Sequence, residues 1–285
     1  MAPIAPRASM ARMLAEIPPA DRESLRPLFA GFPGLHGIVD AALEGTMGTV
    51  RADDATRPTV GVIELDFYLL AGDPQAPAAE DVVRGMSPPW SAVTSTEDWE
   101  ALLRRIWGDA LQTRTRVAFR PGDWDRQRLR RFRETLPDGF TLKRVTAHDD
   151  AQFAELEDSL VYNYPSLEEF SEKGVGFGVE HEGRYVSGCS SFALSSRSLE
   201  FEVQTHPDFR GRGLATACAA AMIEYCLERR LEPCWDAHND ISAALAAKLG
   251  FVEPAPYTAY EVRDEVTAGG GDTTAIAHLL NSDSE

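Results

Sequence analysis

Long apolar runs, paired cysteines and basic side chains are all scarce in this sequence. The longest uncharged apolar run, Leu214 to Ile223, is half the ~20 residues that a membrane span needs, so we expect no membrane association. The N-terminal residues show no apolar stretch of signal-peptide length. The four cysteines form no C-x-x-C motif and no Cys/His cluster with zinc spacing. We therefore expect a cytoplasmic protein with reduced thiols and no metal site.

The deficit of basic residues lies mostly in the second half of the chain. The 28 basic and 45 acidic side chains give a net charge of −17. Residues 1–140 hold 17 basic and 20 acidic side chains, whereas residues 141–285 hold 11 and 25. A surface this negative repels phosphate backbones, which argues against a nucleic-acid partner and favours a cationic ligand.

The length of 285 residues and the 44% hydrophobic content suit two ordinary soluble domains. In the first half, we expect a strand over 59–70, a loop over 72–89, a helix over 96–107, a strand over 116–119 and an arginine-rich helix over 126–133. From Phe140 the pattern becomes that of a compact α/β domain. We expect an N-terminal α+β domain over 1–140, a second domain over 141–263 and a mobile tail over 264–285.

The second half reads as strands alternating with helices. The expected strands cover 141–145, 177–180, 185–194, 199–205, 233–236 and 257–262, and the expected helices cover 149–160 and start at 213 and 240.

One segment of this half predicts an anion site. Residues 199–205 alternate as a strand and lead into His206-Pro-Asp-Phe-Arg-Gly-Arg-Gly, after which an apolar stripe marks a helix. Glycines at 211 and 213 permit a tight turn, and the free amides and dipole of a helix N-terminus favour negative charge. Arg210 and Arg212 add positive charge, so the expected ligand is a pyrophosphate.

This segment resembles the acyl-CoA-binding turn of the GNAT acyltransferases. Arg210-x-x-Gly213-x-Ala215 matches their R/Q-x-x-G-x-G/A motif, and 233–251 resembles their second signature of strand, asparagine, short helix and Gly-Phe. Segments 174–178, 205–216 and 235–242 are similar to the zwittermicin A-resistance type within that family. The resemblance covers about 141–262 and implies a mixed sheet, flanked by helices and splayed between its fourth and fifth strands, with acetyl-CoA in the gap. The first 140 residues are then either a degenerate second copy of this fold or an unrelated α+β cap.

The resemblance also implies which residues meet acetyl-CoA. The implied contacts are Val203, Thr205, Arg210, Gly211, Arg212, Gly213, Leu214, Ala215, Thr216, Asn239 and, more weakly, Ser242. The alternative role for Asn239 is an N-cap on the helix that follows.

Acetyl transfer to an amine needs a base to take the proton of the nitrogen. Glu200 and Glu202 share one face of the strand that carries this base in the family, and we take both as catalytic candidates; the alternative is that both are solvated. Tyr162 and Tyr164 fall in the loop that would overhang the acceptor, or are packing aromatics.

Ala246 stands at the position where the family usually has a tyrosine that acts as the general acid. We expect this small residue to face the cleft and leave space for the acceptor, and the leaving thiolate to take a proton from Tyr257, Tyr260, Ser242 or water.

The function predicted from the sequence is acetyl-CoA-dependent N-acetylation of a small cationic amine, either an antibiotic or a metabolite, by a monomer or homodimer. The alternatives are another acyl-CoA or a peptide amine as substrate, and a non-catalytic acyl-CoA-binding module.

Overall fold

The computed structural model describes residues 14–32 and 34–263, and the tail expected over 264–285 lies outside them. The elements of the first half are β1 (Ala15–Glu16), η2 (Pro19–Phe29), α1 (His36–Glu44), β2 (Thr49–Ala52), β3 (Val60–Glu64), β4 (Tyr68–Gly72), α2 (Pro77–Gly85), β5 (Trp90–Thr94), α3 (Asp98–Trp107), η3 (Gly108–Ala110) and β6 (Gln112–Arg120). After the linking helix α4 (Arg126–Glu134) come β7 (Phe140–Arg144), α5 (Asp150–Leu156), η4 (Asp158–Leu160), α6 (Leu167–Lys173), β8 (Gly176–His181), β9 (Arg184–Leu194), β10 (Ser198–Thr205), η5 (Pro207–Phe209), α7 (Leu214–Arg229), β11 (Glu232–Ala237), α8 (Asp240–Leu249) and β12 (Val252–Val262). Both halves follow one order: strand, two helices, three strands, helix, strand, helix, strand. This order counts the 11-residue 3₁₀ helix η2 as a helix and leaves out the three-residue turns η3, η4 and η5.

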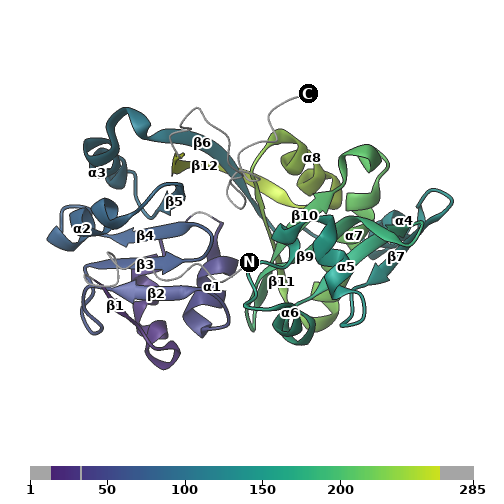
Figure 1. Cartoon of the computed structure of the whole chain (residues 1–285), viewed down its shortest axis with the longest axis horizontal. Coiled ribbons are helices and arrows are strands. Elements are labelled where there is room, and N and C mark those ends of the chain that lie inside the picture. The colour runs from purple at the N-terminus through teal and green to yellow at the C-terminus, as the bar shows by residue number, and fades with distance from the viewer. Residues whose placement is uncertain (1–13, 33, 264–285) are drawn as a thin grey trace.

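All of these strands join one mixed sheet in the order β1-β2-β3-β4-β5-β12-β6-β11-β10-β9-β8-β7. The last strand of each half is exchanged: β6 pairs with β11, and β12 pairs with β5. Figure 1 shows β6 and β12 running side by side between the two lobes, where they pair antiparallel. The expected mixed α+β sheet flanked by helices is confirmed. The domain boundary near residue 140 stays a prediction, and the sheet is continuous across it.

The sheet opens between β10 and β11. These strands are parallel and pair only from Ser198–Glu200 to Glu232–Cys234, so their carboxyl-terminal ends diverge. The corresponding strands of the first half, β4 and β5, are also parallel, but their pairing extends to Thr94, the last residue of β5. Within the described residues, the splay that an acyl-CoA needs therefore opens in the second half and not in the first.

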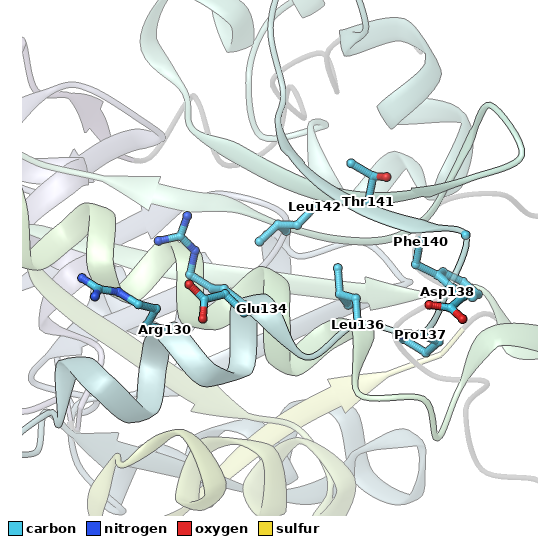
Figure 2. A pocket seen from close by; sticks show the side chains of 10 residues that line it. Arg130, Glu134, Leu136, Pro137, Asp138, Phe140, Thr141 and Leu142 are labelled. Carbon is cyan, nitrogen blue, oxygen red and sulfur yellow. The ribbon is translucent and has the colours of Figure 1, made fainter.

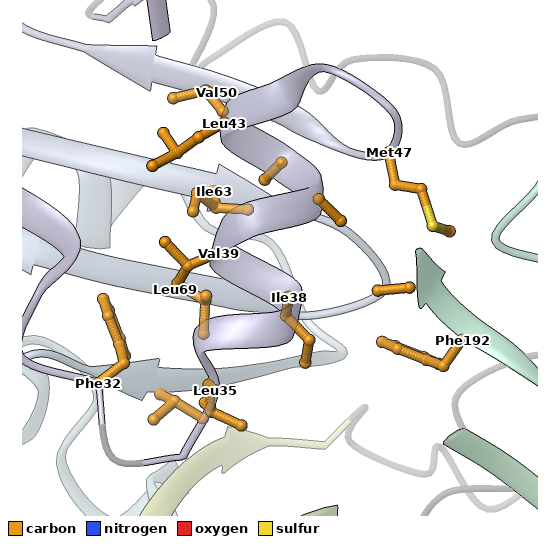
Figure 3. Close-up of a cluster of buried hydrophobic side chains, with 14 of the residues drawn as sticks. Phe32, Leu35, Ile38, Val39, Leu43, Met47, Val50, Ile63, Leu69 and Phe192 are labelled. Carbon is orange, nitrogen blue, oxygen red and sulfur yellow. The ribbon is translucent and has the colours of Figure 1, made fainter. Parts of the chain in front are cut away.

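Alternation along the strands gives the sheet two covered faces. Leu199 and Phe201 of β10 pack in a cluster with α7, while Glu200 and Glu202 point to the other face. On that other face, one apolar cluster contains side chains from α1 and β2–β4 together with side chains from α5 and β9. Figure 3 shows part of it, with Phe192 of β9 next to Met47 of the first half. The two halves therefore share a core. No helix in the described ranges is long and apolar enough to cross a bilayer.

Two expectations for the first half are wrong. The single strand expected over 59–70 is a hairpin, β3 and β4, with a turn at Leu65–Phe67. The sequence shows no turn signal here, because Leu65 and Phe67 are apolar residues that pack against the shared core. The loop expected over 72–89 contains helix α2, which starts at Pro77. In the second half, the expected strands and helices are present, with ends shifted by a few residues.

Candidate active site

The glycine turn before α7 is open on its outer side. Gly211 and Gly213 have φ angles of +74° and +80°, which side chains other than glycine rarely adopt. A Cβ at either position would meet no atom within 4 Å, so the backbone is accessible there. Behind the turn, α7 begins at Leu214 and runs for 16 residues, which directs its free amides and dipole toward the turn. These residues fit the pyrophosphate of a coenzyme A ester.

Three cations lie around this turn. Arg210 Nε donates to the carbonyl oxygen of Thr205 at 3.2 Å, and the Arg212 guanidinium lies over the Phe209 ring at 5.4 Å. Lys248 of α8 donates from Nζ to the hydroxyl of Thr216, in the first turn of α7, at 3.2 Å. Sequence reasoning missed Lys248, because it lies 32 positions from Thr216 on another helix.

The edge of β10 that faces β11 is unpaired beyond Glu200. On its other edge, Val203 and Thr205 pair with Cys189 and Ser187 of β9. Backbone positions from 201 to 205 can therefore pair with an extended ligand lying in the splay.

Asn239 and Ser242 lie at the start of α8, beside the end of β11. Asn239 Oδ1 accepts from the Ser242 amide at 2.8 Å, so the asparagine caps this helix. The Ser242 hydroxyl in turn accepts a hydrogen bond from Trp235 Nε1 at 3.1 Å. The structure thus gives both residues a local structural role, and their contact with acetyl-CoA stays a prediction.

Glu202 has the environment of a general base. Its Oε1 accepts from Gln204 Nε2 at 2.8 Å and from the Ser159 hydroxyl at 3.2 Å. Burial, aided by the negative charge of Asp66, raises the pKa of Glu202 to about 7, while the two hydrogen bonds and Arg116 act against the shift. A carboxylate with this pKa can take a proton near neutral pH.

Glu200 is placed differently, although it shares a face with Glu202. It lies at the paired end of β10, opposite Cys234, and its side chain is directed toward Gly37 of α1. Its Oε1 accepts from the Asp236 amide at 3.0 Å, and burial raises its pKa well above the ordinary range. Glu200 thus lies at the paired end of β10 under α1, whereas Glu202 lies where the strands separate, so the geometry favours Glu202 over Glu200 as the base.

A cluster of charged groups from both halves surrounds Glu202. Asp66, from the β3–β4 turn, accepts a hydrogen bond from the Tyr162 hydroxyl at 2.5 Å. Arg116 of β6 donates from Nε to Asp236 of β11 at 2.7 Å. No sequence motif marks Asp66 or Arg116, because the first half carries no recognisable motif.

The two tyrosines of the expected acceptor loop have different surroundings. Tyr162 reaches Asp66, as described, at the edge of the Glu202 cluster. Tyr164 is buried, its ring packs edge-on against Phe170, and its hydroxyl lies 2.6 Å from Ser191 Oγ. Tyr162 thus lies beside the Glu202 cluster and Tyr164 packs in the core, and contact of either residue with the acceptor stays a prediction.

The expectation that Ala246 faces the cleft is wrong. It is fully buried in the cluster that packs α7 and α8 against the sheet, because its position on α8 points inward.

Of the candidates for proton donor, Tyr260 is also remote: it donates to Glu100 of α3 and packs in the core of the first half. Tyr257 lies beside Arg116 and Asp236, and burial raises its pKa well above 10, which makes it a weak acid.

The four cysteines are free and buried, as expected from their spacing. Burial raises the pKa of Cys218 and Cys226 to about 12, so neither is a reactive thiol. Cys234 lies 3.4 Å from His36 Nε2, which is 2.8 Å from Glu232 Oε1, a trio whose donor atoms suit a metal ion. It lies at the paired end of β11, away from the splay. The expected absence of a metal stays a prediction.

A pocket of about 500 Å³ lies between the end of α4 and β7, and Figure 2 shows its lining. Phe140 in its wall lies under Arg212, at 5.9 Å, so the pocket borders the outer side of the glycine turn. Strands β8 and β9 separate β7 from β10. This pocket is therefore distinct from the cluster around Glu202.

The open glycine turn and the splay beside β10 are the two features that the resemblance to the GNAT acyltransferases implies. The chain belongs to the GNAT acetyltransferase family, whose model matches residues 26–260. The match includes most of the first half, where the sequence shows little resemblance.

Among individual relatives, the uncharacterized N-acetyltransferase YdfB of Bacillus subtilis strain 168 is 32% identical in an alignment over 247 residues, and this alignment covers 79% of this chain and 88% of that protein. The crystal structure of a GCN5-related N-acetyltransferase-like protein from Streptococcus suis 89/1591 is 33% identical, with a TM-score of 0.75 over 86% of this chain and 99% of that one. A tandem GNAT protein from the clavulanic acid biosynthesis pathway, 14% identical, shares the fold with a TM-score of 0.51 over 91% of this chain and 99% of its own.

Proposed function

We propose that this protein transfers the acetyl group of acetyl-CoA to a primary amine of a small cationic molecule, with Glu202 as the general base. The observation that carries the proposal is the position of Glu202. It lies on β10, where the strand separates from β11, and its pKa is raised to about 7. The open turn at Gly211 and Gly213 supports binding of the pyrophosphate at the same end of this strand.

In this reaction the nitrogen of the acceptor attacks the thioester carbonyl carbon, and Glu202 takes the proton that the nitrogen loses. The C–N bond forms and the C–S bond breaks, so the products are an amide and the thiol of coenzyme A. A thiol with a pKa near 8.5 leaves readily as a thiolate at neutral pH. The thiolate is then protonated by solvent, and neither Tyr257 nor Tyr260 is needed as the acid.

The charge of the second half supports a cationic acceptor, since residues 141–285 hold 25 acidic and 11 basic side chains. Similarity of three segments to the zwittermicin A-resistance type makes an aminated antibiotic one acceptor to test, with amine metabolites as the other class. Residence in the cytoplasm and a monomeric or dimeric state stay predictions.

Titration calorimetry with acetyl-CoA, followed by a thiol-release assay over a panel of amines, tests the proposal. We expect micromolar binding and thiol release that depends on the amine. Binding without thiol release for any amine would favour a non-catalytic acyl-CoA-binding module. Faster thiol release from a longer acyl-CoA, or with peptide amines, would favour the other enzyme alternatives.

A further inference from the structure

The first half contributes a carboxylate to the site of the second half. Asp66 lies in the β3–β4 turn, and its neighbour Phe67 stacks on Phe192 of β9 with ring centroids 6.2 Å apart and an interplanar angle of 19°. The loop that carries Tyr162 is tied to the same strand position, because Asn163 Nδ2 donates to the Phe192 carbonyl at 3.0 Å. The turn and the loop therefore hold Asp66 in place beside Glu202.

One oxygen of Asp66 lacks a well-aligned donor. Oδ2 accepts the hydrogen bond from Tyr162, and the backbone amides of Asp66 and Phe67 lie close to the carboxylate. Oδ1 is buried, and no donor among the described residues meets it with full hydrogen-bond geometry. A buried acceptor without a donor is costly, and such groups in native proteins call for an explanation. A donor supplied by a bound ligand would satisfy this oxygen.

Among the described residues no cation is bonded to Asp66, and burial raises the pKa of its carboxyl. A bound cation would stabilise the charged form of this group. Arg116 acts electrostatically on both Asp66 and Glu202, but its guanidinium is hydrogen-bonded to Asp236, at 2.6 and 2.7 Å. The guanidinium nearest to Asp66 is therefore already bonded to another carboxylate, that of Asp236.

We propose, building on the proposed acetyltransferase activity, that Asp66 and Tyr162 bind a second cationic group of the acceptor, so that the substrates are small molecules with at least two basic nitrogens. The reacting nitrogen must lose its proton to Glu202. A carboxylate against that same nitrogen would stabilise its ammonium form and oppose the reaction. Asp66 therefore serves a different nitrogen, which keeps its charge throughout the reaction and orients the acceptor.

Thiol release from acetyl-CoA with matched amines tests this assignment. Linear diamines of three to six carbons are compared with monoamines of the same length, using the full chain. We expect the preferred diamine to exceed its matched monoamine at least tenfold in kcat/KM. At pH 8, where Glu202 is mostly ionised, Asp66→Asn should raise KM for diamines about tenfold and change kcat little, with KM for monoamines unchanged. Because Asp66 also helps to raise the pKa of Glu202, the pH limb of both substrate classes should move to lower pH in this variant. Tyr162→Phe should have a smaller effect in the same direction.

Asp81→Asn, at an exposed aspartate of α2, is the matched control and should behave as the wild type in every assay. Thermal melting and acetyl-CoA binding establish that each variant is folded. Equal use of diamines and monoamines by the wild type, or an equal loss of both in Asp66→Asn, would overturn the assignment of Asp66. Failure of every amine to release thiol would instead refute the proposed acetyltransferase activity, so the two failures are distinguishable.

Discussion

Replacing Glu202 with glutamine removes the proposed base and leaves the rest of the site unchanged. The amide has the size of the carboxylate and keeps an oxygen for the hydrogen bonds from Gln204 and Ser159. It cannot take a proton from the acceptor nitrogen. We expect kcat to fall about 10²-fold, the lower end of what a general base contributes, with acetyl-CoA affinity unchanged.

The pH dependence gives this prediction its magnitude. With a pKa of about 7, Glu202 is about one tenth ionised at pH 6 and about nine tenths ionised at pH 8. The wild-type kcat should therefore rise about tenfold over this interval. The position of this rise on the pH axis is set by burial of Glu202 and by the charge of Asp66, which raise the pKa. The pKa is lowered by Gln204, Ser159 and Arg116. The rise near pH 7 should be absent in Glu202→Gln.

The same substitution should stabilise the fold at alkaline pH. The folded protein holds the Glu202 proton up to about pH 7, whereas the unfolded chain releases it near 4.5. Unfolding therefore releases a proton between these values, and stability falls as the pH rises through this window. The difference corresponds to at most about 3 kcal/mol above pH 7, at 1.36 kcal/mol per unit. Glu202→Gln should melt at a higher temperature than the wild type at pH 8, and at the same temperature at pH 4.

Steady-state thiol release at saturating acceptor, from pH 5.5 to 9, measures the rate effect, and thermal melts at pH 4 and 8 measure the stability effect. Glu172→Gln, at an exposed glutamate of α6, is the control. Wild-type rates with an unchanged limb near pH 7 in Glu202→Gln would refute the reasoning. A loss confined to Glu200→Gln would move the role of base to Glu200.

Three further substitutions test other parts of the site. Gly213→Asp should weaken acetyl-CoA binding at least tenfold in calorimetry. Gly183→Asp is the control and should leave binding intact. Gly183 has a φ of +78° and equally open space, so the substitution introduces similar backbone strain away from the turn. Ala246→Tyr should lower the melting temperature and give no gain in kcat, because a ring added at a fully buried position overpacks the core; a faster enzyme of normal stability would contradict this. Arg116→Met should lower the free energy of unfolding by about 3 kcal/mol or more in urea titration, because it leaves Asp236 unpaired. It should also move the rise of kcat near pH 7 to higher pH, because Arg116 lowers the pKa of Glu202. An unchanged pH profile would show that Arg116 does not act on the base.

The local parts of the site were predictable from short stretches of sequence. The glycine turn follows from two residues that adopt positive φ just before an apolar helical stripe, and the alternation of β10 places Glu200 and Glu202 on one face. The asparagine cap of α8 was one of two roles considered for Asn239. Each of these features depends on neighbours within about one helical turn, so a single sequence contains the information.

The choice between the two glutamates needed the fold. Both residues have the same strand pattern, yet Glu200 is covered by α1 and Glu202 lies beside the splay. The neighbour whose charge helps to raise the pKa of Glu202 is Asp66, which comes from the other half of the chain. Ala246 was misjudged for a related reason: a small side chain suits both an open cleft and a closely packed core.

The sequence alone specified the strands and helices of the second half, the glycine turn and the shared face of Glu200 and Glu202, because these depend on periodicity and on backbone conformations that few residue types adopt. The mixed, splayed sheet was implied by the resemblance to the GNAT acyltransferases. The exchange of β6 and β12 between the halves, and the entry of Asp66 into the site, depend on long-range contacts. Tyr162 and Asp66 are 96 positions apart, and the turn that carries Asp66 reads as uninterrupted strand. Such contacts arise when two halves bury a common apolar face, and no local pattern encodes which residues then meet.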